Sequence, residues 1–362
     1  MTGSLNYYKV KMPLVDPFTT SFGTETEKEA YIFELKKDGI SAFSESVTSI
    51  GPFYSYEDNT TAFHIIKSYL AELVLDAPQP AEFIARSSKV KGHNMAKAAL
   101  EMLLWDYHSR KSGKPLHEYI GKSKGYADVG ISLGIDRKEA TLKKIQAALD
   151  RGYKRIKVKI SKGKEMDILT PIREVYPDIA LSVDANTDYR LRDLEILKKL
   201  DRFNLVYIEQ PLEHDDILDH ARLRKEISTP ICLDESITSA ERAEQALEVE
   251  ACEVINIKPG RVGGFTESLK IAELARERKA HVWVGGMLET GIGRSYNVAL
   301  ASLEAVDYPG DTSPNDKYFE RDLVRNPFSM ENGTIRPNSG TGIGVDIDFE
   351  MINKVKIEAG TF

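Results

Sequence analysis

The chain has 362 residues, with 49 Lys and Arg against 56 Asp and Glu, and a formal net charge of −7. Hydrophobic residues make up 41% and charged residues 29%, which is typical of globular rather than disordered chains. The length predicts about two domains. The acidic balance argues against a general nucleic-acid binder.

The two cysteines, Cys232 and Cys252, are too few for a disulfide framework or a Cys-rich zinc site. The first residues lack the apolar core, about 7–15 residues long, of a signal peptide. No run of about 18 apolar residues predicts a membrane span. We therefore expect a cytoplasmic protein that binds neither nucleic acid nor membrane.

Residues 1–125 are predicted to form a mixed α+β unit. Alternating apolar residues predict strands at 5–12 and 30–36, with a tight turn after the second. Helical spacing predicts helices near 60–76 and 94–112, the latter with Asn94 as its capping residue and its end at Gly113.

From residue 126 short β-rich runs alternate with amphipathic helices, such as those at 193–200 and 266–279. The predicted strands span 129–135, 155–160, 179–185, 204–210, 230–236, 253–259 and 281–286. This alternation predicts a parallel sheet covered by helices. Seven or eight such units favour a closed β/α barrel, with an open doubly wound sheet as the alternative. The tail from about residue 318 is expected to pack back on the first unit.

Charged residues recur near the carboxyl ends of five successive predicted strands. Asp184, Glu209 and Asp234 are each 25 residues apart, Lys159 lies 25 before Asp184, and Lys258 lies 24 after Asp234. In β/α barrels these strand ends form the catalytic face. Each residue alone is better explained as a solvated loop residue or helix cap, but the regular spacing of the set favours a site.

The strand RIKVKI supports this interpretation. Side chains alternate along a strand, so Lys157 and Lys159 share one side while Ile156, Val158 and Ile160 take the other, against the helices. The lysines then point into the barrel, where an unpaired charge costs several kcal/mol. They are expected to have charged partners there.

Three converging carboxylates without Cys or His are hard oxygen ligands, which suit Mg²⁺, with Mn²⁺ as a substitute, rather than zinc. A desolvated lysine beside a metal and another cation has a lowered pKa and can act as a base near neutral pH. The pattern therefore predicts a Mg²⁺-dependent enzyme that removes the proton α to a carboxylate.

The motifs KVK, DAN, IEQPL, CLDES, NIKPGRVGG and GGMLETGIG, in this order, resemble the muconate-lactonizing subgroup of the enolase superfamily over essentially the full length. The resemblance implies a modified (β/α)7β TIM-like barrel over residues 126–317. It also implies an α+β capping domain over residues 1–125, on which the C-terminal residues 318–362 pack back.

The resemblance also implies site roles. It implies that Asp184, Glu209 and Asp234 are the Mg²⁺ ligands. It implies that Lys159, Lys258 and Lys157 are the catalytic lysines, and that Asn186 and Glu235 support the site. It places substrate contacts at Ser132, Tyr54, Met287 and Ile292. Two loops, Phe18–Phe22 and Ser49–Tyr54, are expected to close over the substrate. The family's glycine-rich turn after the second strand is replaced by residues 41–45, SAFSE, so the resemblance does not predict the conformation of that turn.

Within the subgroup the sequence is most similar to o-succinylbenzoate synthases and their racemase kin. The resemblance implies dehydration of a succinyl-cyclohexadiene carboxylate in menaquinone biosynthesis, with N-succinyl or N-acyl amino acid racemisation as the alternative. Dipeptide epimerisation is disfavoured because Met287-Leu288-Glu289 stands where an Asp-x-Asp is usual. Muconate cycloisomerisation and a non-catalytic binding role are further alternatives. The expected partners are a small carboxylate substrate and further copies of this chain.

Overall fold

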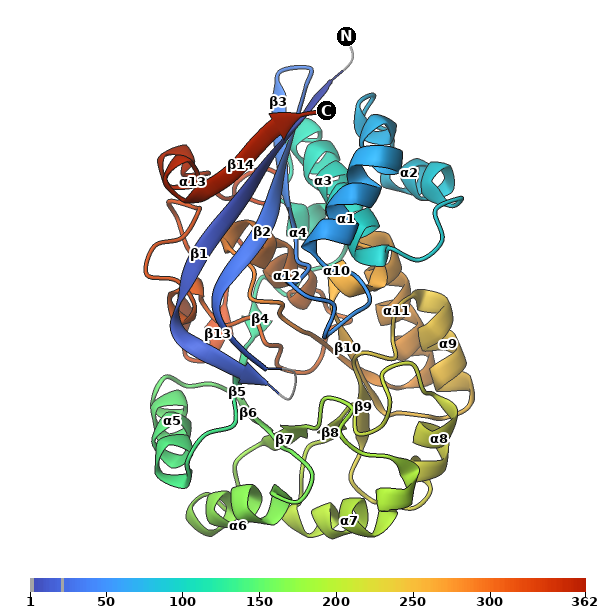
Figure 1. Ribbon diagram of the computed structural model, residues 1–362, viewed down its shortest axis with the longest axis vertical. Coiled ribbons are helices and arrows are strands. Elements are labelled where there is room, and N and C mark those ends of the chain that lie inside the picture. The colour runs from blue at the N-terminus through green and yellow to red at the C-terminus, as the bar shows by residue number, and fades with distance from the viewer. Residues whose placement is uncertain (1–2, 21–22) are drawn as a thin grey trace.

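The computed structural model describes residues 3–20 and 23–362 (Figure 1). Its first part is built on a four-stranded antiparallel sheet in the order β14-β1-β2-β3. The strands span Lys356–Thr361, Ser4–Thr20, Gly23–Lys37 and Ile40–Ser46. Asp38 and Gly39, both at positive φ, form the tight turn between β2 and β3. Residues 41–45 are therefore part of a regular strand.

The β1–β2 hairpin is much longer than the predicted strands at 5–12 and 30–36. Its pairing runs from Ser4 opposite Lys36 to Thr20 opposite Gly23, with an irregularity between Pro13 and Phe18. Much of the outer half is exposed, and Pro13 and Pro17 interrupt the apolar alternation of β1 there, so the sequence does not mark it as a strand. In Figure 1 this half extends from the upper sheet down to the barrel, close to β5 and β6.

The helices that follow in the first part are α1 Asn59–Ile65, α2 Pro80–Ser87, α3 Asn94–Lys111 and α4 Leu116–Tyr119. Of these, α1 and α3 pack against the sheet, and α2 and α4 contact α3. The predicted helix near 60–76 is α1 followed by a π turn at Ile66–Leu70 and a 3₁₀ turn at Ala71–Val74.

The expected cap of α3 is wrong. His93, in the left-handed region, holds the N-cap position, and the Glu57 carboxylate accepts the Met95 and Ala96 N–H groups at 2.8 and 3.0 Å. The Asn94 side chain instead donates to the carbonyl of Thr238 in the barrel, at 2.7 Å.

The second part is a curled sheet of seven parallel strands in the order β11-β10-β9-β8-β7-β6-β5. The seven predicted strands are all present but shorter, at Gly130–Leu133, Arg155–Lys159, Leu181–Asp184, Ile208–Glu209, Ile231–Leu233, Val254–Ile257 and His281–Val284 from β5 to β11. The segment 307–311 bonds to β11 through Val282 and Val284 and to β5 through Gly130. It closes the barrel, so the TIM-like barrel with a capping domain is confirmed and the open sheet is not.

Helices surround this barrel, as Figure 1 shows. They are α5 Lys138–Asp150, α6 Glu165–Val175, α7 Leu194–Lys198, α8 Leu218–Arg224, α9 Ala240–Glu248, α10 Pro259–Val262, α11 Phe265–Arg278 and α12 Gly291–Ala301. Short 3₁₀ turns at Leu191–Asp193 and Lys199–Phe203 flank α7. Buried aromatic rings, Tyr207 and Trp283, fill part of the barrel interior with Cys232 and Val254. No helix of the described residues is long and apolar enough to cross a membrane.

The C-terminal segment contacts both parts. Within it, β12 Met330–Glu331 pairs with β13 Thr334–Ile335, and β13 pairs with β4, Ala127–Asp128. A 3₁₀ turn at Asn315–Lys317 comes before it, and helix α13, Phe349–Val355, leads into β14 beside β1. The domain boundaries at residues 125 and 317 stay predictions.

Two buried glutamates from the first part cap helices of the barrel. Glu101 on α3 accepts the Phe265 and Thr266 N–H groups at the start of α11, at 2.8 and 3.0 Å. Glu45 on β3 accepts the Thr290 and Gly293 N–H groups at the start of α12, both at 3.0 Å. Carboxylates at helix N-termini satisfy free N–H groups and favour the helix dipole. These contacts fix α3 and β3 of the first part to the starts of α11 and α12 in the barrel.

The Glu45 contact gives a pH-dependent stability. Burial raises the pKa of Glu45 to about 7, against the opposing hydrogen bond from Thr290 and the charge of Lys28. Between the ordinary pKa of 4.5 and this value the folded chain holds the proton more tightly than the unfolded chain, so this contribution falls as pH rises. The slope approaches about 1.4 kcal/mol per pH unit.

We predict that the difference in unfolding free energy between wild type and Glu45→Gln shrinks or reverses from pH 5 to pH 7. Urea denaturation across this range measures it, with Glu118→Gln, whose side chain is 59% exposed, as the matched control. A difference that stays constant with pH would show that Glu45 keeps its ordinary pKa.

Candidate active site

Strand register brings the first predicted site residues into one row. Lys159 on β6 stands opposite Asp184 on β7, and Asp184 stands opposite Glu209 on β8. All three lie at the carboxyl ends of their strands, and all are buried. The 25-residue spacing therefore corresponds to direct neighbours across the parallel sheet.

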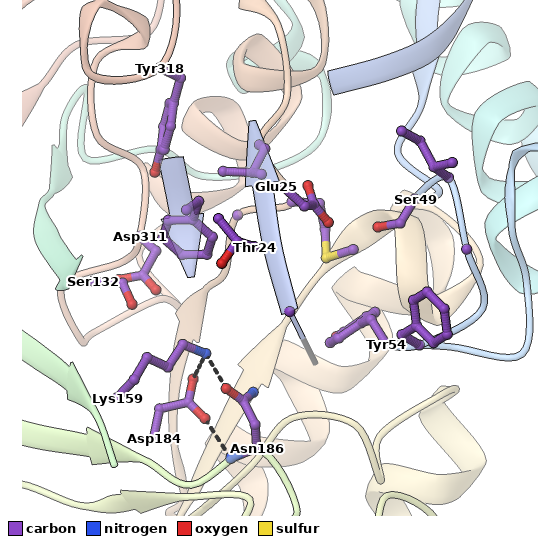
Figure 2. Close-up of a pocket in the computed structure, with 18 of the residues that line it drawn as sticks. Thr24, Glu25, Ser49, Tyr54, Ser132, Lys159, Asp184, Asn186, Asp311 and Tyr318 are labelled. Atoms are coloured by element: carbon purple, nitrogen blue, oxygen red, sulfur yellow. Dashed lines mark hydrogen bonds and ion pairs between the residues drawn. The ribbon is translucent and has the colours of Figure 1, made fainter. Parts of the chain in front are cut away.

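Lys159 is held between two of these groups. Its Nζ lies 2.6 Å from Asp184 Oδ2 and donates to Asn186 Oδ1 at 2.5 Å (Figure 2). Asn186 in turn donates to Glu235 Oε1 at 3.2 Å. The pKa of Asp184 is lowered, because the charges of Lys159 and Lys157 outweigh its desolvation. The Lys159 ammonium therefore faces the cavity from a fixed position.

Lys157 is the most heavily paired cation of the site. Its Nζ lies 2.6 Å from Glu209, 2.9 Å from Asp311 and 3.4 Å from Asp184, and stands 4.6 Å from the ring centre of Trp283. Although burial alone would lower its pKa, these carboxylates raise the pKa well above its usual value. The Lys157 ammonium is therefore surrounded by three carboxylates in this arrangement.

The opposite side of the barrel carries a second cationic group. Lys258 Nζ lies 2.8 Å from Asp234 Oδ2 and 3.0 Å from the Tyr54 hydroxyl, and Arg261 pairs with Asp234 Oδ1. Burial lowers the pKa of Lys258, but Tyr54 and the Glu235 carboxylate outweigh it and the net shift is upward. The expected lowering of the lysine pKa is therefore not found for Lys258 or Lys157 in this arrangement.

Gly285 makes room for this cation. A Cβ at this position would lie 2.8 Å from Lys258 Cε and closer still to the Asn256 amide. The absence of a side chain at Gly285 therefore allows Asn256 of β10, and Lys258 just after β10, to pack against the end of β11.

A cavity of about 640 Å³ opens above these groups. Lys159, Lys258, Lys157, Asp184 and Asn186 line its floor, and the hairpin tip and the loop 49–54 line its sides. In Figure 2, Ser132, Asp311 and Tyr318 follow one wall and Tyr54 and Ser49 the other. Two segments far apart in sequence, both from the capping part, therefore cover the catalytic face.

Three of the four predicted substrate contacts line the cavity and one does not. Ser132, Tyr54 and Met287 line the cavity. Ile292 does not; it is fully buried in the first turn of α12, and Leu288 lines the cavity instead. Phe18 lines the cavity, whereas Ser21 and Phe22 of the predicted closing loop lie outside the described residues.

Sequence reasoning missed a buried ion pair behind the lysines. Arg155 is 2% exposed, and its Nη2 donates to Asp311 Oδ1 at 2.6 Å while its Nε donates to the Pro309 carbonyl at 3.1 Å. The charges of Lys157 and Arg155 hold the pKa of Asp311 below its usual range despite burial. Arg155 was detectable, because it shares the strand face of Lys157 and Lys159.

The chemistry of the donor set, though not its present spacing, suits a hard divalent cation. Asp184, Glu209 and Asp234 offer only oxygen, and two further buried oxygens, Glu235 Oε2 and Asn256 Oδ1, have no hydrogen-bond partner. In the arrangement described for residues 3–20 and 23–362, no three acidic, His or Cys side chains stand close enough together to hold a metal ion. Lysine and arginine are their counterions here, and a metal at these oxygens would compete with those cations.

Comparisons with known proteins agree with this architecture. Residues 4–121 match the family model described as mandelate racemase / muconate lactonizing enzyme, N-terminal domain, and residues 140–351 match the model described as enolase C-terminal domain-like. The chain therefore belongs to the enolase superfamily, with the domains of the mandelate racemase and muconate lactonizing enzymes.

Individual relatives cover nearly the whole chain. An o-succinylbenzoate synthase of Geobacillus stearothermophilus is 44% identical over 349 residues, 95% of this chain and 93% of the relative. An N-succinylamino acid racemase of Thermus thermophilus is 39% identical over 351 residues, 96% of this chain and 95% of the relative. A solved enolase superfamily member from Listeria innocua superposes with a TM-score of 0.95 at 36% identity, covering 100% and 98% of the two chains.

We predict that Arg155→Met lowers the free energy of unfolding by about 3–5 kcal/mol, because it leaves a buried carboxylate short of a partner. Chemical denaturation measures the loss. The matched control is Arg151→Met, which removes a surface pair with Asp316 at 3.5 Å and is expected to cost at most about 1 kcal/mol. Equal losses in the two variants would mean that the buried pair carries no special weight.

Proposed function

We propose that this chain is an o-succinylbenzoate synthase, which dehydrates a succinyl-cyclohexadiene carboxylate to an aromatic acid. The observation that carries the proposal is the pair of lysines, Lys159 and Lys258, that line one cavity from β6 and from the end of β10. The similarity to o-succinylbenzoate synthases over nearly the full length supports the choice of reaction.

We propose that Asp184, Glu209 and Asp234 hold Mg²⁺, or Mn²⁺ in its place, with Asn186 and Glu235 supporting them. Members of the superfamily generally use Mg²⁺. When bound, the ion supplies positive charge beside the substrate carboxylate and so favours loss of the neighbouring proton. The oxygen-only donor set and the unpaired oxygens of Glu235 and Asn256 support this assignment.

Lys159 has the position of the base. Once its Nζ is neutral, it takes the α-proton of the cyclohexadiene acid and returns that proton to the departing hydroxide, which leaves as water. Asn186 and Asp184 fix the position of Nζ during both transfers. Lys157, paired with Glu209 and Asp311, adds a constant positive charge.

Lys258 has the position of a fixed cation on the other side of the substrate. Asp234 and Tyr54 hold its ammonium in place. A cation there stabilises negative charge that develops in the ring without moving a proton.

Racemisation of N-succinyl or other N-acyl amino acids is the second candidate. Its first step is the same proton abstraction, and racemase relatives match the chain about as fully as the synthases. In that reaction the two lysines exchange roles, one removing the α-proton and the other returning it on the opposite face.

The cellular setting is also a proposal. An o-succinylbenzoate synthase serves menaquinone biosynthesis, and its substrate is a small carboxylate. The two cysteines are free and buried, which suits a reducing cytoplasm. We further propose that the chain forms homo-oligomers.

We predict that Lys159→Ala lowers kcat for dehydration by about 10²–10⁴-fold, because the proton acceptor is lost. The test uses the succinyl-cyclohexadiene acid and Mg²⁺, with formation of the aromatic product followed by absorbance. Lys162→Ala, at an exposed lysine beyond the same strand, is the control and should keep wild-type activity. Wild-type protein that forms no aromatic product would contradict the synthase.

We predict that Lys258→Met separates the two activities. It should abolish α-hydrogen exchange of one enantiomer of an N-succinyl amino acid in D₂O and with it racemisation, because the second proton carrier is gone. Dehydration should lose only the contribution of a fixed charge and remain measurable. Complete loss of both reactions in folded protein would show that Lys258 moves a proton in the dehydration as well.

A further inference from the structure

A buried arginine stands behind the cavity wall. Arg294, on α12, is 0% exposed and is not among the described residues that line the cavity. Its Nη1 donates to the backbone carbonyl of Asp311 at 2.8 Å, and its Cζ lies 5.7 Å from the Tyr318 ring centre. Asp311 and Tyr318 both line the cavity, on the wall that Figure 2 shows. Arg294 therefore contacts two segments of this wall from inside the protein.

The same guanidinium reaches a third segment through a glutamate. Arg294 Nη2 lies 2.9 Å from Glu289 Oε2, and this contact is an ion pair without hydrogen-bond alignment. Glu289 Oε1 accepts the Met287 N–H and the Asn297 side-chain N–H, both at 2.7 Å. The Glu289 side chain therefore closes a turn around Leu288, and both Met287 and Leu288 line the cavity.

This turn is strained where it meets the cavity. Leu288 has a φ of 57°, in the left-handed region that a leucine rarely adopts. Residues persist in such conformations where the surrounding structure determines them. Directly before the turn, a Cβ at Gly286 would lie 2.9 Å from the Asp311 carbonyl oxygen and 3.3 Å from Arg294 Nη1. The conformation of Leu288 therefore depends on close contacts behind the wall.

Stability alone gives little reason for a charged pair at this place. Arg294 and Glu289 are 0% and 3% exposed, and apolar residues of similar volume often replace such a buried pair without loss of stability. Among the described residues, Arg294 Nε has no hydrogen-bond partner, so the pair is not fully satisfied. An apolar pair cannot supply the directed contacts that one planar guanidinium makes to several segments. The pair is therefore better explained by the geometry it imposes.

We propose that Arg294 and Glu289 are positioning residues that set the shape of the substrate cavity, by holding the turn at Leu288 against the wall of Asp311 and Tyr318. The inference rests on the proposed function, because it concerns how that same site binds its substrate. Lys159 and Lys258 belong to other strand ends, so a looser turn should weaken substrate binding more than proton transfer.

Hydrogen–deuterium exchange followed by mass spectrometry tests the positioning without any substrate. The variant combines Arg294→Met with Glu289→Gln, which leaves no unpaired charge and keeps an acceptor for the Met287 N–H. We expect the peptide over residues 286–290 to exchange about tenfold faster than in wild type, while the peptide over α11 is unchanged. Equal exchange of the 286–290 peptide in the two proteins would overturn the inference.

The kinetics of dehydration test the effect on the substrate. We expect the double variant, and Arg294→Lys, which keeps the charge without the guanidinium fork, to raise KM by about tenfold or more while kcat stays within about threefold.

Arg173→Met is the matched control. Arg173 also ties backbone carbonyls together, those of Phe203 and Ile179 at 2.7 and 2.9 Å, but neither is a described cavity-lining residue. The control should lower the urea midpoint of unfolding and leave KM unchanged.

Three kinetic results would overturn the inference and leave the proposed function standing. They are a wild-type KM in the double variant, a loss of kcat without a change in KM, and an equal rise of KM in Arg173→Met. Wild type that makes no aromatic acid would overturn the proposed function, whereas faster exchange of the 286–290 peptide in the double variant would still support the positioning role. Where the double variant does not fold, Arg294→Lys decides in both measurements.

Discussion

Charges buried at the ends of parallel strands must neutralise one another, and this constraint organises the whole catalytic face. Lys159 pairs with Asp184, Lys157 with Glu209 and Asp311, and Lys258 and Arg261 with Asp234. Removing one partner of such a buried pair typically costs about 3–5 kcal/mol. The site is therefore preorganised by the same interactions that make it stable, and a metal ion or a substrate carboxylate exchanges with existing counterions.

The capping part completes the site in two ways. Its hairpin tip and the loop 49–54 cover the catalytic face, and Tyr54 reaches down to both Lys258 and Asp234. Its buried glutamates, Glu45 and Glu101, hold the starts of the helices that follow the last two strands. Because the second of these helices follows the cavity-lining residues Met287 and Leu288, the position of the cap and the shape of the substrate cavity depend on each other.

Much of this site was predictable from periodicity. A barrel repeats a strand about every 25 residues here, so residues at the same place in successive units become neighbours, as Asp184 and Glu209 do. Alternation along one strand placed Lys157 and Lys159 inside, and the same rule would have found Arg155. Asp311 was missed because the segment 307–311, which closes the barrel, lacks the β-rich sequence pattern of the other strands.

Other features depend on contacts that no local pattern contains. The outer half of the β1–β2 hairpin is held by its own pairing and by a hydrogen bond from the Val15 N–H to the Tyr318 carbonyl at 2.9 Å, and the cap of α3 comes from Glu57, far from the helix start in sequence. Ile292 was expected at the cavity because the family resemblance places a substrate contact there. The helix instead begins at Gly291 and turns its first residues into the core. The lysine pKa values depend on which oxygens face each ammonium, which spacing alone does not determine.

The most direct test is a titration with Mn²⁺, followed by the EPR signal of the free ion, on wild type and on Asp184→Asn, Glu209→Gln and Asp234→Asn. If these three carboxylates together hold the ion, wild type binds one Mn²⁺ per chain and each variant loses that site. Asp311→Asn, a carboxylate at the same strand ends that serves only Arg155 and Lys157, should keep it. Binding that survives all three substitutions, or wild type that binds no ion, would contradict the account.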